Sequence, residues 1–125
     1  MMKMIILYFS TLIVFLAVDV VGIRFLIRPI FERSTIVLAK TRQRLGPLKT
    51  LIGVGGVDSG ETALAKIEAG ADLVQLYTGM IYKGPGIAND IRRELSAALD
   101  KSGTAAITNL RDAKMKDWAQ KPIPA

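Results

Sequence analysis

Two short turns concentrate the groups that could do chemistry in this sequence of 125 residues. Gly55 and Gly56 follow a short apolar run, and Thr78 with Gly79 follows a second apolar run further along the chain. Glycine permits positive φ angles and lets backbone N–H groups approach an anion closely. The threonine hydroxyl adds another donor. These turns predict a phosphate site, although glycines that only reverse the chain would look the same.

The spacing around these glycines differs from the common nucleotide motifs. It is not GxGxxG, and no Lys-Ser/Thr pair follows the glycines as in a P-loop. The sequence has neither cysteine nor histidine. This excludes a disulfide framework, a thiolate nucleophile, a Ser-His-Asp triad and imidazole metal ligands. We therefore assign neither a catalytic residue nor a metal ligand.

Helices and short strands are expected to alternate after residue 34. In order, the pattern predicts a helix over Thr35–Leu45, a strand over Leu51–Val54, a helix over Glu61–Ala69, a strand over Asp72–Tyr77, a short helix over Met80–Tyr82 and a helix over Ile87–Lys101. Such alternation is typical of parallel βαβ units. Two strands cannot close a barrel or bury a full sheet. The prediction is therefore one part of a larger α/β fold with an open strand edge.

Three local details accompany this prediction. Ser34 is expected to cap the first of these helices, and Gly46 is expected to end it. The strand over Leu51–Val54 is uniformly apolar, which predicts burial on both of its faces. Asp58 is expected to help cap the helix that begins near Glu61.

The N-terminal segment Met4–Ile23 is apolar and carries a single charge, Asp19. At about 1.5 Å per residue, a helix of this length spans a bilayer core. The net charge of +6 lies in a basic stretch directly behind it, so the positive-inside rule predicts an inner-membrane helix with the C-terminal part in the cytoplasm, contacting lipid. A cleaved signal peptide is the alternative, although an Ala-x-Ala exit is missing. Asp19 is either an ion site or an interfacial residue that faces Arg24.

A basic stretch of this kind also raises nucleic acid as a partner. Proteins that bind single-stranded nucleic acid interleave aromatic side chains among their basic residues. The basic stretch here has no interleaved aromatics and adjoins an apolar span. We therefore expect no nucleic-acid partner.

Three segments together resemble a known family. RPIFERSTIVLAKTRQRLG, LIGVGGVDSGETALAKIEAGADLVQLYTGMIYKGPG and DAKMKDWAQKP are similar to the C-terminal part of class 2 dihydroorotate dehydrogenase, the quinone-reducing flavoenzyme of pyrimidine synthesis. The resemblance implies the C-terminal βαβα portion of a (β/α)8 TIM barrel over residues 28–125. It also implies that Gly55 and Gly56 approach the phosphate of FMN from the seventh strand, and that Tyr77 and Thr78 do so from the eighth.

Several family features are missing from the sequence. The catalytic Ser base, the Lys beside the flavin and the Asn residues that hold dihydroorotate belong to earlier strands of the family. A Gly-Leu-Ser-Gly stretch that also contacts FMN is replaced by Gly22–Ile27. Residues 1–27, a predicted transmembrane helix and junction, are instead similar to the opening helix of a family of small bacterial membrane proteins.

Two interpretations of the function follow from these observations. The first is a dihydroorotate dehydrogenase-like flavoprotein that keeps mainly the FMN-phosphate loops, with dihydroorotate and quinone as partners of a complete enzyme only. The alternative is a catalytically inactive, membrane-anchored remnant or interaction module. Its open strand edge would pair with a complementary barrel fragment.

Overall fold

The computed structural model describes residues 1–124, apart from the side chains at positions 23, 24 and 26–28. It divides the chain into two compact units, Met1–Ile30 and Phe31–Ala125. The expected pairing of Asp19 with Arg24 falls outside the described residues, because the Arg24 side chain is among those not described. The side chain of Arg28, at the expected domain boundary, falls outside them too.

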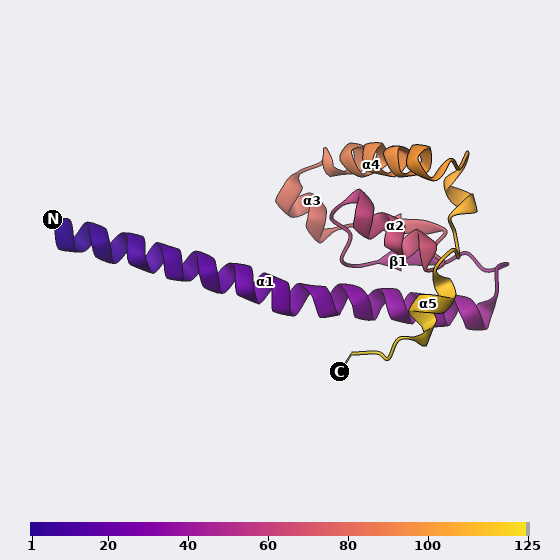
Figure 1. Cartoon of the computed structure of the whole chain (residues 1–125), viewed down its shortest axis with the longest axis horizontal. Helices are drawn as coiled ribbons and strands as arrows, with labels where there is room; N and C mark the ends of the chain where they lie inside the picture. Colours follow the sequence, from indigo (N-terminus) through magenta and orange to yellow (C-terminus); the bar gives the residue numbers. More distant parts are fainter. Residues whose placement is uncertain (125) are drawn as a thin grey trace. The chain divides into compact units, whose positions relative to one another are not determined.

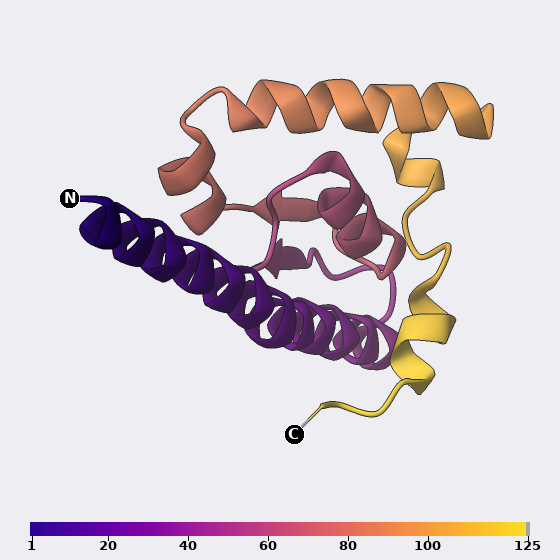
Figure 2. The ribbon, with the colours of Figure 1, turned by 60° about the vertical axis from the view of Figure 1, so that its left-hand side comes forward.

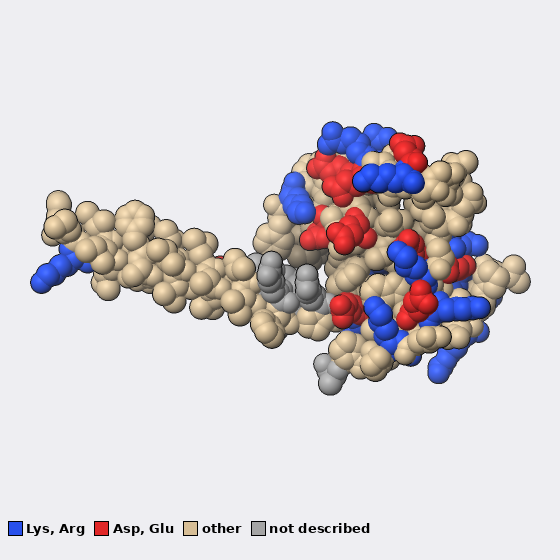
Figure 3. Space-filling model, in the orientation of Figure 1, with Lys and Arg blue, Asp and Glu red and all other residues tan. Residues whose placement is uncertain are grey.

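The first unit is formed by the beginning of a long helix, α1 (Met2–Leu45). Its segment Met2–Gly22 has a mean hydropathy of 2.5 and buries none of its residues in the structure. Among the described residues, this is one helix long and apolar enough to cross a membrane by length and composition. A signal sequence has the same properties, so both sequence-based interpretations of this segment stand. In Figure 3 the helix is almost entirely tan, and the charged side chains gather over the second unit.

The expected helix start at Ser34 is wrong, because α1 continues through this position to Leu45. Ser34 does not cap a helix; its Oγ donates to the carbonyl oxygen of Phe31 at 2.9 Å, one turn earlier. Helix-forming residues lie on both sides of Pro29, which interrupts the helical hydrogen bonding only locally. The expected end of the helix is confirmed. Gly46 follows Leu45 with a φ of +74°, the left-handed conformation that commonly terminates helices.

The second unit alternates helices and strands as predicted (Figure 1). After α1 come β1 (Ile52–Val54), α2 (Gly60–Glu68), β2 (Leu73–Gln75), α3 (Thr78–Lys83), α4 (Ile87–Ser102), a short 3-10 helix (Ile107–Asn109) and α5 (Met115–Gln120). The two strands pair in parallel, with Ile52 opposite Leu73 and Val54 opposite Gln75. This confirms the expected parallel βαβ unit.

Two small apolar clusters hold the second unit together. In the first, Val57 and Ala63 pack against Ile87 and Ile91, two residues of the apolar stripe on α4. Figure 2 shows α4, in orange, lying along one side of α2. In the second cluster, Ala39 of α1, Ala69 at the C-terminal end of α2 and Ala119 of α5 pack together with the partly buried Trp118. The single tryptophan therefore reports on the packing of the second unit.

Strand β1 is not buried on both faces, so that expectation is wrong. Only Gly53 is buried, while Ile52 and Val54 are 51% and 54% exposed. Leu73 on the paired strand is 59% exposed on the same face. The α2 side of the sheet is covered and the opposite side is not. A uniformly apolar strand predicts two covered faces, but the described residues supply a cover for one of them.

Candidate functional site

The structure brings the two predicted phosphate turns to one edge of the sheet. Gly55 and Gly56 directly follow β1, and Tyr77 and Thr78 come just after β2. Because β1 and β2 are paired and parallel, their carboxyl ends lie side by side. All four residues are exposed. The sheet therefore places the four predicted site residues side by side at its carboxyl end. Gly55 and Gly56 lie in the turn after β1, whereas Thr78, expected in a second turn, is the first residue of α3; the segment Tyr77–Gly79 is called the second loop below.

The backbone donors of these loops are free of protein partners. In the described part of the chain, the amides of Gly55, Gly56, Tyr77 and Thr78 make no hydrogen bond. Gly55 and Gly56 have φ angles of +87° and +69°, so the turn after β1 depends on glycine. A Cβ added at Gly55 would meet nothing within 4 Å. Exposed, unpaired N–H groups in successive turns are the donors that anion sites use.

Close packing fixes the positions of both loops. A Cβ on Gly56 would lie 2.7 Å from the ring of Phe31 on α1. A Cβ on Gly79 would lie 2.8 Å from the carbonyl oxygen of Val57, so the second loop touches the first. Lys83 of α3 adds a further contact to the first loop, because its Nζ donates to the carbonyl oxygen of Asp58 at 2.8 Å. The two loops therefore form one packed surface.

The N-terminus of α2 is satisfied from within the protein. Ser59, not Asp58 as expected, is the N-cap, and it forms a reciprocal capping box with Thr62. The Gly60 amide donates to Glu94 Oε2 at 2.5 Å. Capping side chains and a carboxylate therefore already occupy this end of α2, so it offers fewer free amides to an anion than the two loops do.

Lys66 is fully buried, which the sequence analysis missed. Its Nζ donates to Ser34 Oγ at 2.6 Å and to Thr35 Oγ1 at 3.2 Å, and it lies 4.9 Å from the centre of the Phe31 ring. Burial lowers the pKa of this ammonium from its usual 10.5 to about 8. One signal was available: Lys66 lies three residues after Ala63, on the same helix face. Lys66 thus links α2 to the part of α1 whose Phe31 ring packs against Gly56.

This buried ammonium gives the protein an unusual pH dependence. The unfolded chain keeps the Lys66 proton up to the ordinary pKa of 10.5, whereas the folded chain loses it near 8. Between these values the unfolded state binds more protons, so stability rises with pH and the gain is complete above 10.5. We expect Lys66→Met to remove an increase in the free energy of unfolding on the order of 2 kcal/mol across this pH range. The increase is less than the full pKa shift would give, since nearby hydroxyls partly solvate the charge.

The measurement is urea unfolding of the full chain in mild detergent, followed by Trp118 fluorescence across the alkaline range. Lys101→Met is the matched control, because Lys101 is exposed on α4. The control should retain the pH dependence of the wild type. If the free energy of unfolding changed equally with pH in Lys66→Met and in the wild type, Lys66 would not be the source of the pH dependence.

A network of ion pairs lies at the opposite, amino-terminal end of the strands. Asp72 accepts from the Leu51 amide at 2.8 Å, pairs with Arg42 at 3.4 Å and accepts from Arg111. Arg42 is buried, and its Nε also donates to Asp112 at 2.9 Å. Desolvation alone would raise the Asp72 pKa, but the Leu51 amide and the two guanidinium groups outweigh it and hold that pKa below its ordinary value. No spacing in the sequence predicted these long-range contacts.

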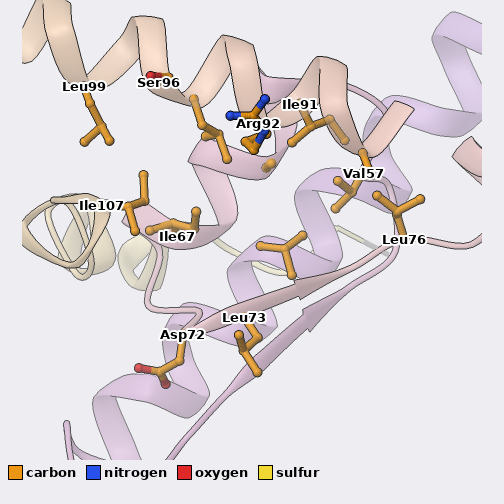
Figure 4. Close-up of a pocket in the computed structure, with 14 residues that line it drawn as sticks. Val57, Ile67, Asp72, Leu73, Leu76, Ile91, Arg92, Ser96, Leu99 and Ile107 are labelled. Atoms are coloured by element: carbon orange, nitrogen blue, oxygen red, sulfur yellow. The ribbon is translucent and has the colours of Figure 1, made fainter. Parts of the chain in front are cut away.

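Two cavities lie beside the loops. The first, of about 500 Å³, opens between β2, α2 and α4 and is mostly apolar, with Leu73, Leu76, Ile91 and Leu99 in its wall (Figure 4). The second, of about 460 Å³, lies between the α2 N-terminus and α4 and has a charged lining. Neither is lined by Gly55, Gly56, Tyr77 or Thr78. The predicted phosphate site is therefore an open surface of two loops.

Comparison with known proteins identifies the family. The family model described as dihydroorotate dehydrogenase matches residues 28–99. The chain belongs to the dihydroorotate dehydrogenase family. The dihydroorotate dehydrogenases (quinone) of Brucella ovis and Brucella anthropi are similar to it, with 60% identity over 95 residues and 61% over 97 residues. These alignments cover 76% and 78% of this chain.

The same comparisons show that only part of a dihydroorotate dehydrogenase domain is present. The chain spans about a quarter of the length of these relatives, 26% and 27%. Solved structures of the Eimeria tenella dihydroorotate dehydrogenase agree. Its complex with ferulenol aligns with a TM-score of 0.65 and 29% identity, over 69% of this chain and 23% of that one. The ligand-free form aligns with a TM-score of 0.61 and 27% identity, over 70% and 23%. The second unit is thus a mixed α/β piece of this fold.

Proposed function

We propose that this chain is the part of a quinone-dependent dihydroorotate dehydrogenase that holds the phosphate of FMN. Residues 28–125 would be the C-terminal βαβα portion of a (β/α)8 barrel, and residues 1–27 would anchor it in the inner membrane. In such barrels the loops after the last two strands commonly form a phosphate site. The supporting observation is the set of free amides at Gly55, Gly56, Tyr77 and Thr78, at the carboxyl ends of two paired parallel strands.

The chain's own residues would bind and orient, and FMN would supply the hydride chemistry. Gly55 and Gly56 offer amides from one side, while Tyr77 and Thr78 offer amides and a hydroxyl from the other. The packed contact between Gly79 and Val57 keeps the two sets of donors together. Preorganised donors of this kind stabilise a phosphate dianion without reorganisation.

Weak FMN binding is the expected result for the purified full chain. A few phosphate contacts must offset the lost freedom of the ligand, so we expect a Kd within roughly tenfold of 1 mM. Riboflavin, which lacks the phosphate, should not bind, and inorganic phosphate should compete with FMN. Thr78→Val removes one hydroxyl donor to a charged group and should weaken binding about tenfold. Quenching of flavin fluorescence measures the binding of FMN and of riboflavin, the competition by phosphate and the effect of Thr78→Val.

Thr108→Val is the matched control for this experiment, because Thr108 is exposed in the short 3-10 helix and away from both loops. It should bind FMN as the wild type does. Equal binding of riboflavin and FMN, or FMN binding at nanomolar protein, would contradict a site made of phosphate contacts alone.

We expect no dihydroorotate-dependent reduction of a quinone dye by the purified chain. The chain spans about a quarter of its curated relatives. The resemblance places the family's Ser base and substrate-binding Asn residues on earlier strands than the two described here. The assay uses chain reconstituted in detergent with added FMN. Dihydroorotate and quinone would then act only on a complete enzyme, and clear turnover would overturn this assignment.

Membrane attachment is tested separately from FMN binding. We expect the full chain to resist carbonate extraction from bacterial membranes and to keep its N-terminal residues by intact mass. The apolar segment Met2–Gly22 is long enough to span a bilayer core. A mature chain that lacks this segment would show instead that the segment is a signal sequence.

A further inference from the structure

The buried ammonium of Lys66 is held by neutral groups. Its Nζ donates to Ser34 Oγ at 2.6 Å and to Thr35 Oγ1 at 3.2 Å. Both hydroxyls donate in turn to the carbonyl oxygen of Phe31, so their own oxygens accept from the ammonium. The centre of the Phe31 ring lies 4.9 Å from Nζ. The two hydroxyls and the ring solvate the positive charge, but none of them carries a negative charge to balance it.

The charged groups on the elements around Lys66 do not supply that balance. Among residues 1–124, no carboxylate forms an ion pair with Lys66. The charged residues of the second unit on α1 and α2 and at the start of β2 are either exposed (Glu32, Arg33, Arg44 and Glu61) or bonded to other partners (Lys40, Arg42, Glu68 and Asp72). A buried charge without an opposite charge is costly. Lys66 therefore holds a positive charge that an anion from outside the chain can compensate.

The side chain of Phe31 connects this charge to the predicted phosphate site. A Cβ on Gly56 would lie 2.7 Å from Cδ2 of Phe31 and 3.1 Å from its Cβ, so the first loop packs directly against the side chain that Lys66 contacts. One aromatic side chain thus separates the ammonium from the loop of Gly55 and Gly56. Charges that interact across apolar protein are screened less than charges in water.

We propose that Lys66 supplies the counter-charge for a dianion held at the two loops, and that it acts across the Phe31 side chain without touching the ligand. This rests on the proposed function, because it takes the loops to be the site of a phosphate group. Lys66 is then a positioning residue that favours a dianion over a neutral ligand. The coupling is reciprocal: the ammonium raises the affinity of the loops for a dianion, and a bound dianion raises the pKa of Lys66 by the same factor.

Anion binding that depends on Lys66 must weaken at alkaline pH. The backbone amides of the loops do not titrate, whereas burial lowers the pKa of Lys66 to about 8. Affinity for a dianion is therefore expected to be highest below this value. It should fall as the pH rises and Lys66 loses its proton. A purely structural role for Lys66 gives no such pH profile.

The test is sulfate binding to the full chain in mild detergent, followed by the amide NMR shifts of Gly55 and Gly56. Sulfate stays a dianion between about pH 7 and pH 9.5, so the charge of the ligand is constant while Lys66 titrates. At constant ionic strength, we expect the affinity of the wild type to fall roughly five- to tenfold across this range. Lys66→Met should bind sulfate as weakly at the lower pH as the wild type does at the higher pH.

Lys83→Met is the matched control. Lys83 is also a lysine beside the loops, since its Nζ donates to the carbonyl oxygen of Asp58, but it is exposed. Lys83→Met should retain the fall of sulfate affinity with pH. The unfolding midpoints of both variants, followed by Trp118 fluorescence, establish that they fold.

A second measurement needs no variant. The NMR shift of Lys66 Cε follows the protonation of its amine in the wild type, and saturating sulfate should raise the midpoint of this titration. Chloride at the same ionic strength should leave the midpoint unchanged.

Each outcome decides the inference. Sulfate affinity that is constant with pH overturns it, and so does a pH dependence that Lys66→Met retains. A Lys66 midpoint that sulfate does not move overturns it as well, while FMN binding to the same chain would still support the FMN proposal. Coupling of Lys66 to sulfate in a chain that does not bind FMN supports the inference and counts against the FMN proposal, so the two failures are distinguishable.

Discussion

Asp72→Asn is expected to lower the free energy of unfolding of the second unit by about 3 kcal/mol. The Asp72 carboxylate pairs with Arg42, whose side chain is almost fully buried, and with Arg111. Loss of the negative charge leaves the buried Arg42 guanidinium with the partly exposed Asp112 as its remaining carboxylate partner, and a buried charge that is poorly compensated costs more than the pair itself contributes. Urea unfolding followed by Trp118 fluorescence measures the loss.

Asp90→Asn is the matched control for this prediction. Asp90 also pairs with an arginine, Arg93, but both side chains are largely exposed. Exposed ion pairs of this kind contribute about 0.5 kcal/mol or less. We therefore expect a clear separation between the two variants. Equal losses would show that the network at Asp72 is no more important than a surface pair.

Gly70→Ala is expected to have an effect of similar size for a different reason. Gly70 has a φ of +119°, which residues with a Cβ rarely adopt. An added Cβ would also lie 2.6 Å and 2.8 Å from Cγ and Cβ of Arg42 and 3.0 Å from Oδ1 of Asp112. Because Arg42 is held by its ion pairs, it cannot move aside without breaking them. We expect Gly70→Ala to lower the free energy of unfolding by about 3 kcal/mol.

Gly103→Ala separates the backbone cost from the steric cost. Gly103 has a φ of +65° at the end of α4, and an added Cβ there would meet nothing within 4 Å. This variant should lose only about 1 kcal/mol, the usual cost of a left-handed backbone. The same urea titration applies to both glycines. A Gly70→Ala loss no greater than that of Gly103→Ala would show that Arg42 adapts freely.

Local sequence patterns predicted the elements of the second unit well. The glycine-terminated helix, the two short strands and the helix beginning at Ile87 all depend on near neighbours in the chain, so periodicity and turn residues reveal them. The start of α1 was mispredicted, since Ser34 resembles a cap but lies within a run of residues that continue a helix. The capping role given to Asp58 belongs to the adjacent Ser59, an error of one position that is common at helix ends.

These local patterns could not predict contacts between residues that are far apart in the sequence. The pairing of Arg42 with Asp72 and the burial of Lys66 against Ser34 depend on how the βαβ unit folds back on α1. The exposure of Ile52 and Val54 has a related origin. Apolar composition shows that these side chains require a cover, but it does not show whether the same chain provides one. The four residues Gly55, Gly56, Tyr77 and Thr78 could be proposed as a site because they come shortly after two successive strands.

The uncovered face of β1 and β2 has a consequence for the life of this polypeptide in a cell. Within residues 1–124 the short sheet has two open edges and exposes Ile52, Val54 and Leu73, and chaperones and quality-control proteases engage surfaces of this kind. Newly made copies would be degraded or would aggregate unless that face is occupied soon after synthesis. The abundance of the protein would then follow the supply of whatever occupies it, and its turnover would be fastest in cells that make it alone.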